Sequence, residues 1–190
     1  VFVSLMLQSC SMAEPYFNSA PSVKLKSLSD VIKWRMTKGP SPERMSIDLS
    51  EDWRNLDSES SHFAVWVGHA TYLINNGDLT ILTDPIFSGR ASPISWAGPK
   101  RLIPPAIPLN ELPKIDVVMI SHNHYDHLDL SSLKQLQALY PEVVIFVPSG
   151  DKKLLEGANL INVREFNWWD NAQISDTEFT FTPVQHWSGR

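Results

Sequence analysis

The chain has 190 residues, of which 43% are hydrophobic and 19% are charged, a balance typical of one globular domain with a hydrophobic core. Its formal net charge of −5 excludes a broad basic surface, so we expect no nucleic-acid partner. The single cysteine, Cys10, excludes an internal disulfide, and packing, with or without a bound metal, must hold the fold.

The N-terminal residues 1–25 are predicted to be a signal-like and linker segment, and residues 26–190 the folded domain. Residues 1–7 are apolar but far fewer than the roughly 20 that a membrane-spanning helix needs. Together with Cys10 they are similar to a bacterial lipoprotein signal, which would attach the protein to the cell envelope. The alternative is a plain terminus with a free thiol and a cytoplasmic or membrane-associated protein. The first residue is not Met, and the chain stops after an extended run, so we expect both ends to be cut.

The first half of the domain is predicted to be a short helix followed by strands. Residues 29–36 favour a helix capped by Ser29, and residues 42–61 favour a loop. Residues 63–67, 71–74 and 79–82 are strand-like, and Asn76-Gly77 predicts a hairpin between the last two. Residues 86–113 carry prolines at 93, 99, 104, 105 and 108, which excludes a helix and predicts a long, functional loop.

The second half is predicted to contain a βαβ unit. Residues 115–120 form an apolar, β-branched run typical of a strand buried on both faces. A helix capped by Ser131-Ser132 follows, with an apolar stripe of Leu133, Leu136 and Tyr140, and residues 143–147 form the next strand. Residues 161–163 and 178–181 are further strands, with a turn between them at residues 168–170. Ligands gather at the carboxyl ends of such strands, where the chain places its histidines.

Four ligand-type side chains follow the first of these strands in the order H-x-H-x-D-H. His122 and His124 are two residues apart and can bind one cation, while Asp126 and His127 reach a second. Imidazole nitrogens with one carboxylate suit zinc better than calcium or magnesium, whereas iron and manganese stay open. A solvated loop does not explain four such groups within six positions, so the sequence predicts a metal site.

The first metal needs a third protein ligand, and three further histidines are available, at positions 62, 69 and 186. His186 comes just after a predicted strand, as a ligand from another sheet edge would, and is predicted to bind this metal. His69 lies between two strands and is predicted to support the site or the fold rather than to bind metal.

Several stretches together resemble a known family. They are residues 66–71, 82–87, 90–93, 95–101, 121–129 and 185–190. The sequence resembles the metallo-β-lactamase superfamily, and within it the branch that contains N-acyl-phosphatidylethanolamine phospholipase D and its bacterial relatives. The resemblance runs from about residue 63 to the end of the chain.

The resemblance implies an α/β fold, the αββα sandwich, of which this sequence holds the N-terminal part only. It also implies two zinc ions between the sheets, one held by His122, His124 and His186 and the other by Asp126 and His127. Asp84 would organise the metal loop rather than bind metal. The family pattern includes a bridging aspartate and a further histidine later in the chain, and this sequence ends before either, so we expect one metal to be held well and the other poorly.

The activity implied is that of a zinc-dependent phosphodiesterase of phospholipase D type, acting on N-acyl-phosphatidylethanolamine-like lipids. Two metals lower the pKa of a shared water, and Asp126 would orient the resulting hydroxide and take its proton. The alternatives are a lactone hydrolase of the same fold and a metal-binding fragment without turnover. The net negative charge of the chain disfavours a nuclease, because it gives no attraction to nucleic-acid phosphates.

Substrate contacts are less well defined by the sequence. Arg90, Lys100 and Arg101 lie in the proline-rich loop with Trp96 and could hold a phosphate while apolar neighbours meet acyl chains. An equally good interpretation is a solvated loop. We expect a phospholipid or other small-molecule substrate and, as one option, association with a membrane surface; the oligomeric state is undetermined by the sequence.

Overall fold

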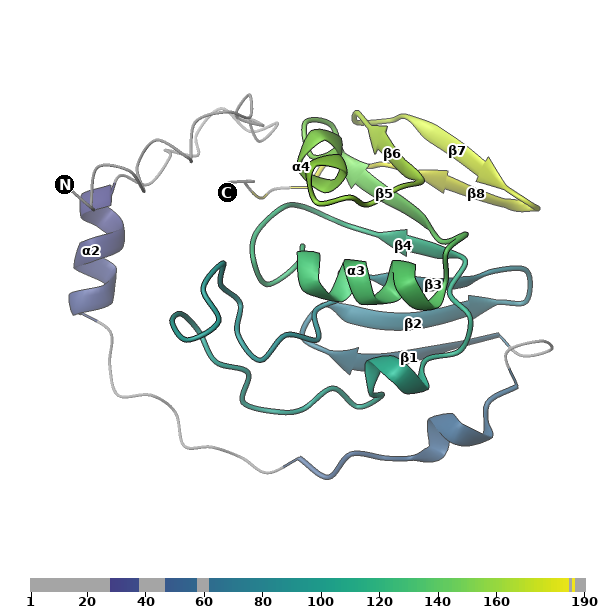
Figure 1. Cartoon of the computed structure of the whole chain (residues 1–190), viewed down its shortest axis with the longest axis horizontal. Coiled ribbons are helices and arrows are strands. Elements are labelled where there is room, and N and C mark those ends of the chain that lie inside the picture. The colour runs from purple at the N-terminus through teal and green to yellow at the C-terminus, as the bar shows by residue number, and fades with distance from the viewer. Residues whose placement is uncertain (1–27, 38–46, 58–61, 185, 187–190) are drawn as a thin grey trace.

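The computed structural model describes residues 28–37, 47–57, 62–184 and 186. The predicted N-terminal segment and Cys10 lie outside these residues. The helices are α2 (Leu28–Met36), α3 (Leu130–Leu139) and α4 (Lys152–Gly157), with short 3-10 turns at η1 (Asp52–Asn55) and η2 (Leu109–Glu111). The strands are β1 (His62–Gly68), β2 (Thr71–Asn76), β3 (Thr80–Thr83), β4 (Val117–Met119), β5 (Val144–Pro148), β6 (Val163–Phe166), β7 (Asn171–Ile174) and β8 (Thr177–Thr180) (Figure 1).

Six strands form one mixed sheet in the order β1-β2-β3-β4-β5-β6, and β7 and β8 form a separate hairpin. Strands β1, β2 and β3 pair antiparallel, and β3 to β6 pair parallel. The predicted hairpin at Asn76-Gly77 is confirmed: the Asn76 side chain accepts hydrogen bonds from the backbone of Asp78 and Leu79, and Gly77 has φ +84°. The predicted βαβ unit is also confirmed, because α3 connects the adjacent parallel strands β4 and β5.

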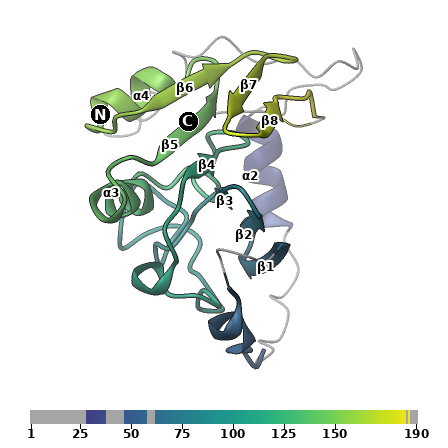
Figure 2. The same ribbon diagram turned by 90° about the vertical axis from the view of Figure 1, so that its right-hand side faces the viewer.

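The central strands of the sheet are covered on both faces, by α3 and α4 on one face and by β7 and β8 on the other (Figure 2). Val118 of β4 faces one side and packs in a core with residues of α3 and α4, whereas its neighbour Val117 faces the other side. The second core joins the sheet to β8 through Phe146 and Phe179, whose ring centroids lie 5.1 Å apart. A continuous apolar run is what a strand covered on both faces requires. Within the described residues, no helix has the length and apolar character needed to cross a bilayer.

Helix boundaries differ from the predicted ones by a few residues. Helix α3 begins one residue before Ser131, and its cap is Asp129, whose carboxylate accepts a hydrogen bond from the Ser131 backbone; the prediction of a serine cap was therefore wrong. Helix α2 begins at Leu28, so Ser29 lies inside its first turn rather than at its cap. The predicted stripe on α3 is confirmed, since Leu133 and Leu136 are fully buried and Tyr140 packs against the same core.

The strands near the C-terminal end were predicted less well. Strand β6 begins only at Val163, because Asn159 and Asn162 take positive φ values in the preceding turn and leave Ile161 exposed. Helix α4 and strand β7 were not predicted, since both are short and carry few apolar residues. Their formation depends on neighbours: Leu155 of α4 packs in the first core, and Ala172 of β7 packs in the second.

The buried stripe of α3 gives a direct test of the fold. Leu136 is fully buried and Leu139, on the same helix, is 48% exposed. We expect Leu136→Ala to lower the free energy of unfolding by about 2–5 kcal/mol, because it removes apolar contacts and leaves a cavity. Leu139→Ala should change it by only about 0.5 kcal/mol. Urea denaturation followed by circular dichroism measures both, and equal losses would contradict this packing.

Candidate metal centre

The histidine-rich loop lies between β4 and α3, at the carboxyl end of the parallel strands. A tight turn forms within it, in which the backbone of His127 and of Leu128 each donates to the His124 carbonyl, at 3.0 and 2.9 Å. This turn brings Asp126 and His127 beside the earlier histidines. The Asn123 side chain points away and donates to Asp151 Oδ1 at 2.7 Å, which fastens the loop to the start of α4.

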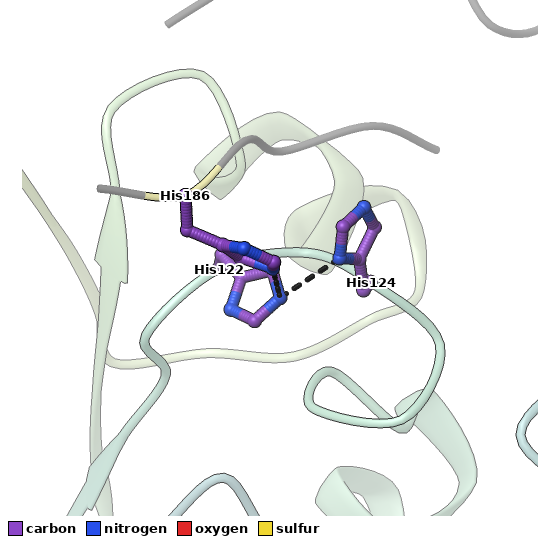
Figure 3. Close-up of side chains that lie close together, drawn as sticks. All are labelled: His122, His124 and His186. Atoms are coloured by element: carbon purple, nitrogen blue, oxygen red, sulfur yellow. Dashed lines mark hydrogen bonds between the residues drawn. The ribbon is translucent and has the colours of Figure 1, made fainter. Parts of the chain in front are cut away.

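One group of ligand atoms consists of His122, His124 and His186 (Figure 3). His122 Nε2 lies 2.9 Å from His124 Nδ1 and 3.1 Å from His186 Nε2. Two nitrogens that bind one zinc tetrahedrally, at about 2.0–2.1 Å, lie about 3.3–3.4 Å apart, within a few tenths of an ångström of these separations. The three histidines are therefore brought together as the sequence predicted.

The electrostatics of this group favour metal binding. Burial lowers the pKa of His122 to about 4, helped by the nearby charges of His127 and His124. Burial also lowers the pKa of His124, with a smaller effect from His186. Both rings are thus favoured in the neutral form, and only a neutral imidazole offers a lone pair to a metal. The group fits a divalent cation such as zinc, although its donors would also accept iron or manganese.

A second group consists of His69, Asp126 and His127. Asp126 Oδ2 lies 3.1 Å from His69 Nε2 and 3.8 Å from His127 Nε2. Burial acts to raise the pKa of Asp126, but backbone hydrogen bonding and the charges of His127 and His69 outweigh it, so the pKa is lowered and the carboxylate is ionised. Two nitrogens and one carboxylate oxygen again suit zinc. The rings of His122 and His127 are 4.1 Å apart, so the two groups are contiguous.

The structure gives His69 a different position from the supporting one that the sequence predicted. Two side chains of this chain were expected at the second metal, and the structure brings three together. His69 follows Gly68 in the turn between β1 and β2, and its φ of +51° is a rare conformation for a non-glycine residue. The Trp66 indole donates to the His69 carbonyl at 2.9 Å and helps to hold this turn. The sequence indicated a place between two strands, but the contact with Asp126 depends on how β1 and β2 pair beside β3.

Asp84, at the end of β3, connects the two groups through hydrogen bonds. Its Oδ1 accepts from the Ser121 backbone at 2.7 Å, and its Oδ2 accepts from Ser121 Oγ at 2.7 Å and from His127 Nδ1 at 2.8 Å. Burial acts to lower the pKa of His127, but the hydrogen bond and charge of Asp84 raise it overall. Asp84 was predicted to organise the metal loop rather than to bind metal, and it lies outside both ligand groups.

Ser121 extends this network to the first group. A carboxylate only accepts hydrogen bonds, so the Ser121 hydroxyl gives its one proton to Asp84 and accepts from His122 Nδ1, 2.9 Å away. His122 then carries its proton on Nδ1 and its lone pair on Nε2, the atom that faces His124 and His186. Asp84 therefore orients His127 directly and His122 through Ser121. Ser121 was not predicted as a site residue, because a serine before a histidine carries no local signal of this role.

The proline-rich loop is tied to the same region. The half-buried Arg101 guanidinium donates to the carbonyls of Ile86 and Ser88, and burial lowers its pKa despite the opposing charge of Asp129. Asp129 also accepts from the Ser88 backbone at 3.0 Å. Arg101 therefore holds the loop together, in addition to any contact with substrate. Lys100 is exposed, and Arg90 is partly exposed.

Two apolar cavities adjoin the two groups of ligands. A cavity of about 280 Å³ has His122 and His186 in its wall, and its apolar lining includes Phe146, Phe166, Phe179 and Phe181. A groove of about 810 Å³ has His69, His124 and Asp126 in its wall, and its apolar lining includes Trp66, Leu102 and Ile103. The candidate metal centre is thus bordered by apolar surface on two sides.

Residues 80–190 match the family model described as the beta-lactamase superfamily domain. The chain belongs to this superfamily. The match includes β3, the histidine-rich loop and His186, and it confirms the predicted α/β fold of the metallo-β-lactamase type.

Similar proteins within the superfamily indicate the branch to which the chain is related. The chain is 42% identical over 141 residues to the N-acyl-phosphatidylethanolamine-hydrolyzing phospholipase D 1 of Caenorhabditis elegans, covering 70% of this chain and 40% of the relative. It is 37% identical over 141 residues to the mitochondrial N-acyl-phosphatidylethanolamine-hydrolyzing phospholipase D of Saccharomyces cerevisiae, covering 72% and 30%. An uncharacterized protein of Mycobacterium tuberculosis is 34% identical over 164 residues, covering 84% and 44%. The chain therefore lies in the predicted phospholipase D-like branch and spans less than half the length of these relatives.

Among solved structures, CmlA, a diiron beta-hydroxylase from Streptomyces venezuelae, is similar with a TM-score of 0.49 and 22% sequence identity. The likeness covers 63% of this chain and 23% of that chain. It is too distant to bear on the metal or the reaction of this chain.

The role of Ser121 can be tested by its effect on metal affinity. We expect Ser121→Ala to weaken zinc binding by about tenfold to a hundredfold, because His122 loses the hydrogen bond that orients its lone pair. Ser121→Thr keeps a hydroxyl and should bind zinc almost as wild type does. Competition with a zinc-sensitive dye measures both affinities. If the alanine variant binds zinc as tightly as wild type, Ser121 does not orient His122.

The place of His69 in the second ligand group predicts a change in the zinc content of the protein when this residue is replaced. After loading with excess zinc and dialysis, His69→Ala should hold fewer zinc ions per chain than wild type, because Asp126 and His127 alone make a weaker site. The control is His62→Ala, since His62 is exposed on β1 and lies in neither group. Atomic emission after dialysis gives the zinc content of both variants. An unchanged zinc content in His69→Ala would return His69 to a supporting role.

Proposed function

We propose that this chain forms the metal-binding part of a phosphodiester hydrolase of phospholipase D type, with N-acyl-phosphatidylethanolamine-like lipids as substrates. The observation that supports this most directly is the pair of contiguous ligand groups between two apolar cavities. The relatives named as N-acyl-phosphatidylethanolamine-hydrolyzing enzymes support the substrate class. The chain spans less than half of the length of these relatives, so the activity of the whole enzyme is itself part of this proposal.

Zinc is the proposed cofactor in both groups. His122, His124 and His186 would hold one ion, and His69, Asp126 and His127 would hold the other. Zinc ions bound there would lower the pKa of water towards neutrality and polarise a phosphoryl oxygen. Asp84 and Ser121 hold the Nδ1 sides of His122 and His127, which leaves their Nε2 atoms available within the two ligand groups.

Asp126 is proposed to act on the reacting water as well as to bind metal. Its side chain is 45% exposed and lies in the wall of the larger groove, where a substrate can reach it. The lowered pKa of Asp126 keeps it ionised, so it can orient a water molecule and accept its proton.

The apolar surroundings favour a lipid over a small lactone. A phosphodiester that links two lipid parts presents apolar groups on both sides of the bond that breaks. The cavity beside His186 and the groove beside His69 provide apolar surface on both sides of the centre. A sugar lactone is small and polar and would leave these surfaces unfilled.

Hydrolysis of three substrates by the full-length protein tests this proposal. We expect N-acyl-phosphatidylethanolamine to be hydrolysed faster than a bis-aryl phosphodiester, and a sugar lactone slowest. His122→Ala should lower turnover of the lipid by at least about a thousandfold, because the first metal loses the ligand that contacts both other histidines of its group. His62→Ala serves as the control and should keep wild-type turnover.

Two results would contradict the proposal. Preferential hydrolysis of the lactone would support the alternative lactonase. The absence of turnover on all three substrates, in a protein that holds zinc, would support a metal-binding module without catalysis.

A further inference from the structure

Asn123 lies between the first two histidines of the loop, and its side chain points away from their ligand atoms. It is 5% exposed, and its Nδ2 donates to Asp151 Oδ1 at 2.7 Å. Residues two apart in an extended segment point the same way, and the residue between them points the opposite way. An anchored Asn123 therefore restricts rotation of the segment that carries His122 and His124.

Asp151 reaches the loop because of the order of the strands. It lies at the start of α4, which follows β5, and β5 pairs parallel with β4, the strand that leads into the loop. Gly150 has φ +95°, a conformation that favours glycine, and turns the chain from β5 into α4. The Asp151 carbonyl accepts from the backbone of Leu154 and of Leu155, at 3.0 and 3.2 Å, and Leu155 is fully buried. Asp151 is thus fixed to a helix that is packed in the first core.

The carboxylate of Asp151 does not cap its own helix. An aspartate at this position commonly accepts a hydrogen bond from the backbone of the first turn, but the Asp151 side chain makes no such bond. Glu165 of β6, the strand beside α4 in Figure 1, serves the start of the helix instead. Its Oε1 accepts from the backbone of Gly150 at 2.7 Å and of Lys152 at 2.8 Å. Glu165 therefore leaves the Asp151 carboxylate directed at the histidine-rich loop.

The burial of Asp151 indicates that this contact has a purpose beyond packing. Asp151 is 4% exposed, and the transfer of a carboxyl group out of water costs free energy that an apolar side chain of similar size would not cost. Asn123 is buried as well, and its amide needs an acceptor there. The position next to the loop thus requires a hydrogen-bond acceptor, which Asp151 supplies.

We propose that Asp151 is a positioning residue for the first ligand group. It acts through Asn123, which keeps the backbone between His122 and His124 in place while their ligand atoms lie 2.9 Å apart. Glu165 supports this role by capping α4. The inference rests on the proposed function, because it concerns the group to which that proposal assigns the first zinc ion.

The role of Asp151 differs from that of Asp84. Asp84 and Ser121 hold the Nδ1 side of the His122 ring, whereas Asp151 holds the neighbouring backbone through Asn123. The first contact sets the direction of one ring, and the second sets the place of the segment that carries two rings. Loss of either is expected to weaken metal binding by itself.

The zinc affinity of variants of the full-length protein tests this role. Asp151→Ala removes the acceptor and should weaken zinc binding by about tenfold. Asp151→Asn keeps an acceptor oxygen and should bind zinc within about threefold of wild type. Competition with a zinc-sensitive dye measures both affinities. The visible absorption of bound cobalt depends on the geometry of its ligands and should change in the alanine variant only.

A double-mutant cycle shows whether Asp151 acts through Asn123. Asn123→Ala should weaken zinc binding about as much as Asp151→Ala does. The double variant should lose no more than either single variant, because the same hydrogen bond is absent from all three. Glu165→Ala should cause a smaller loss, since the uncapped backbone of α4 then competes for the Asp151 carboxylate. If Asp151→Ala does not fold, Asn123→Ala and Glu165→Ala carry the test with the same expected losses.

Two controls separate positioning from a general loss of stability. Asp176→Ala removes an exposed carboxylate in the turn between β7 and β8 and should bind zinc as wild type does. Leu136→Ala destabilises the core and, at a temperature where circular dichroism shows it folded, should also keep the wild-type zinc affinity.

Three outcomes would overturn the positioning role. They are zinc binding by Asp151→Ala as tight as that of wild type, a double variant that loses the product of the two single losses, and a loss in Leu136→Ala as large as in Asp151→Ala. If any of these occurs while N-acyl-phosphatidylethanolamine is still hydrolysed by the wild type, the positioning role fails and the proposed function stands. The expected zinc affinities in a protein that hydrolyses no phosphodiester would uphold the positioning role and reject the function.

Discussion

The buried carboxylate of Asp84 is the constraint on which the candidate metal centre depends. A carboxylate that is only 6% exposed needs hydrogen-bond donors, and Asp84 finds three of them in Ser121 and His127. Its φ of +36° places it in a strained backbone conformation at the end of β3. Its three hydrogen bonds offset this strain and burial. They also fix both the start and the end of the histidine-rich loop, at Ser121 and at His127. One residue outside the ligand groups thus sets the orientation of a histidine in each.

The sheet order explains why ligands from distant segments meet. Strands β3 to β6 are parallel, so the segments that follow them all begin at the same end of the sheet, where the carboxyl ends of these strands lie. The turn between β1 and β2 lies at this same end, because β2 runs antiparallel to both β1 and β3. His186 reaches it after β8, which packs on the opposite face of the sheet from α3. The histidine-rich loop supplies four of the six ligand-type side chains, and the other two come from these neighbouring segments.

The surroundings of the centre are as informative as the ligands. Apolar side chains border both ligand groups, and the groove leads to a loop that combines positive charge with exposed tryptophan and leucine. The same loop is held by Arg101 and by Asp129, the cap of α3, which also immediately follows the histidine-rich loop. The proline-rich loop and the histidine-rich loop are therefore fastened to each other at Asp129. The proposed substrate, a lipid phosphodiester, would use all of these features together.

The sequence by itself determined the elements that depend on neighbouring residues: the β2–β3 hairpin, the βαβ unit and the position of the H-x-H-x-D-H loop after a buried strand. Their signals are periodicity and turn chemistry, which consecutive residues encode. The division at residue 25 stays a prediction, because residues 1–27 lie outside the described part of the chain. Only the tertiary structure decided that His69 contacts Asp126, 57 residues away, and that the Ser121 hydroxyl links Asp84 to His122. These contacts depend on strand order and side-chain direction, which are fixed by long-range packing and leave no local pattern in the sequence.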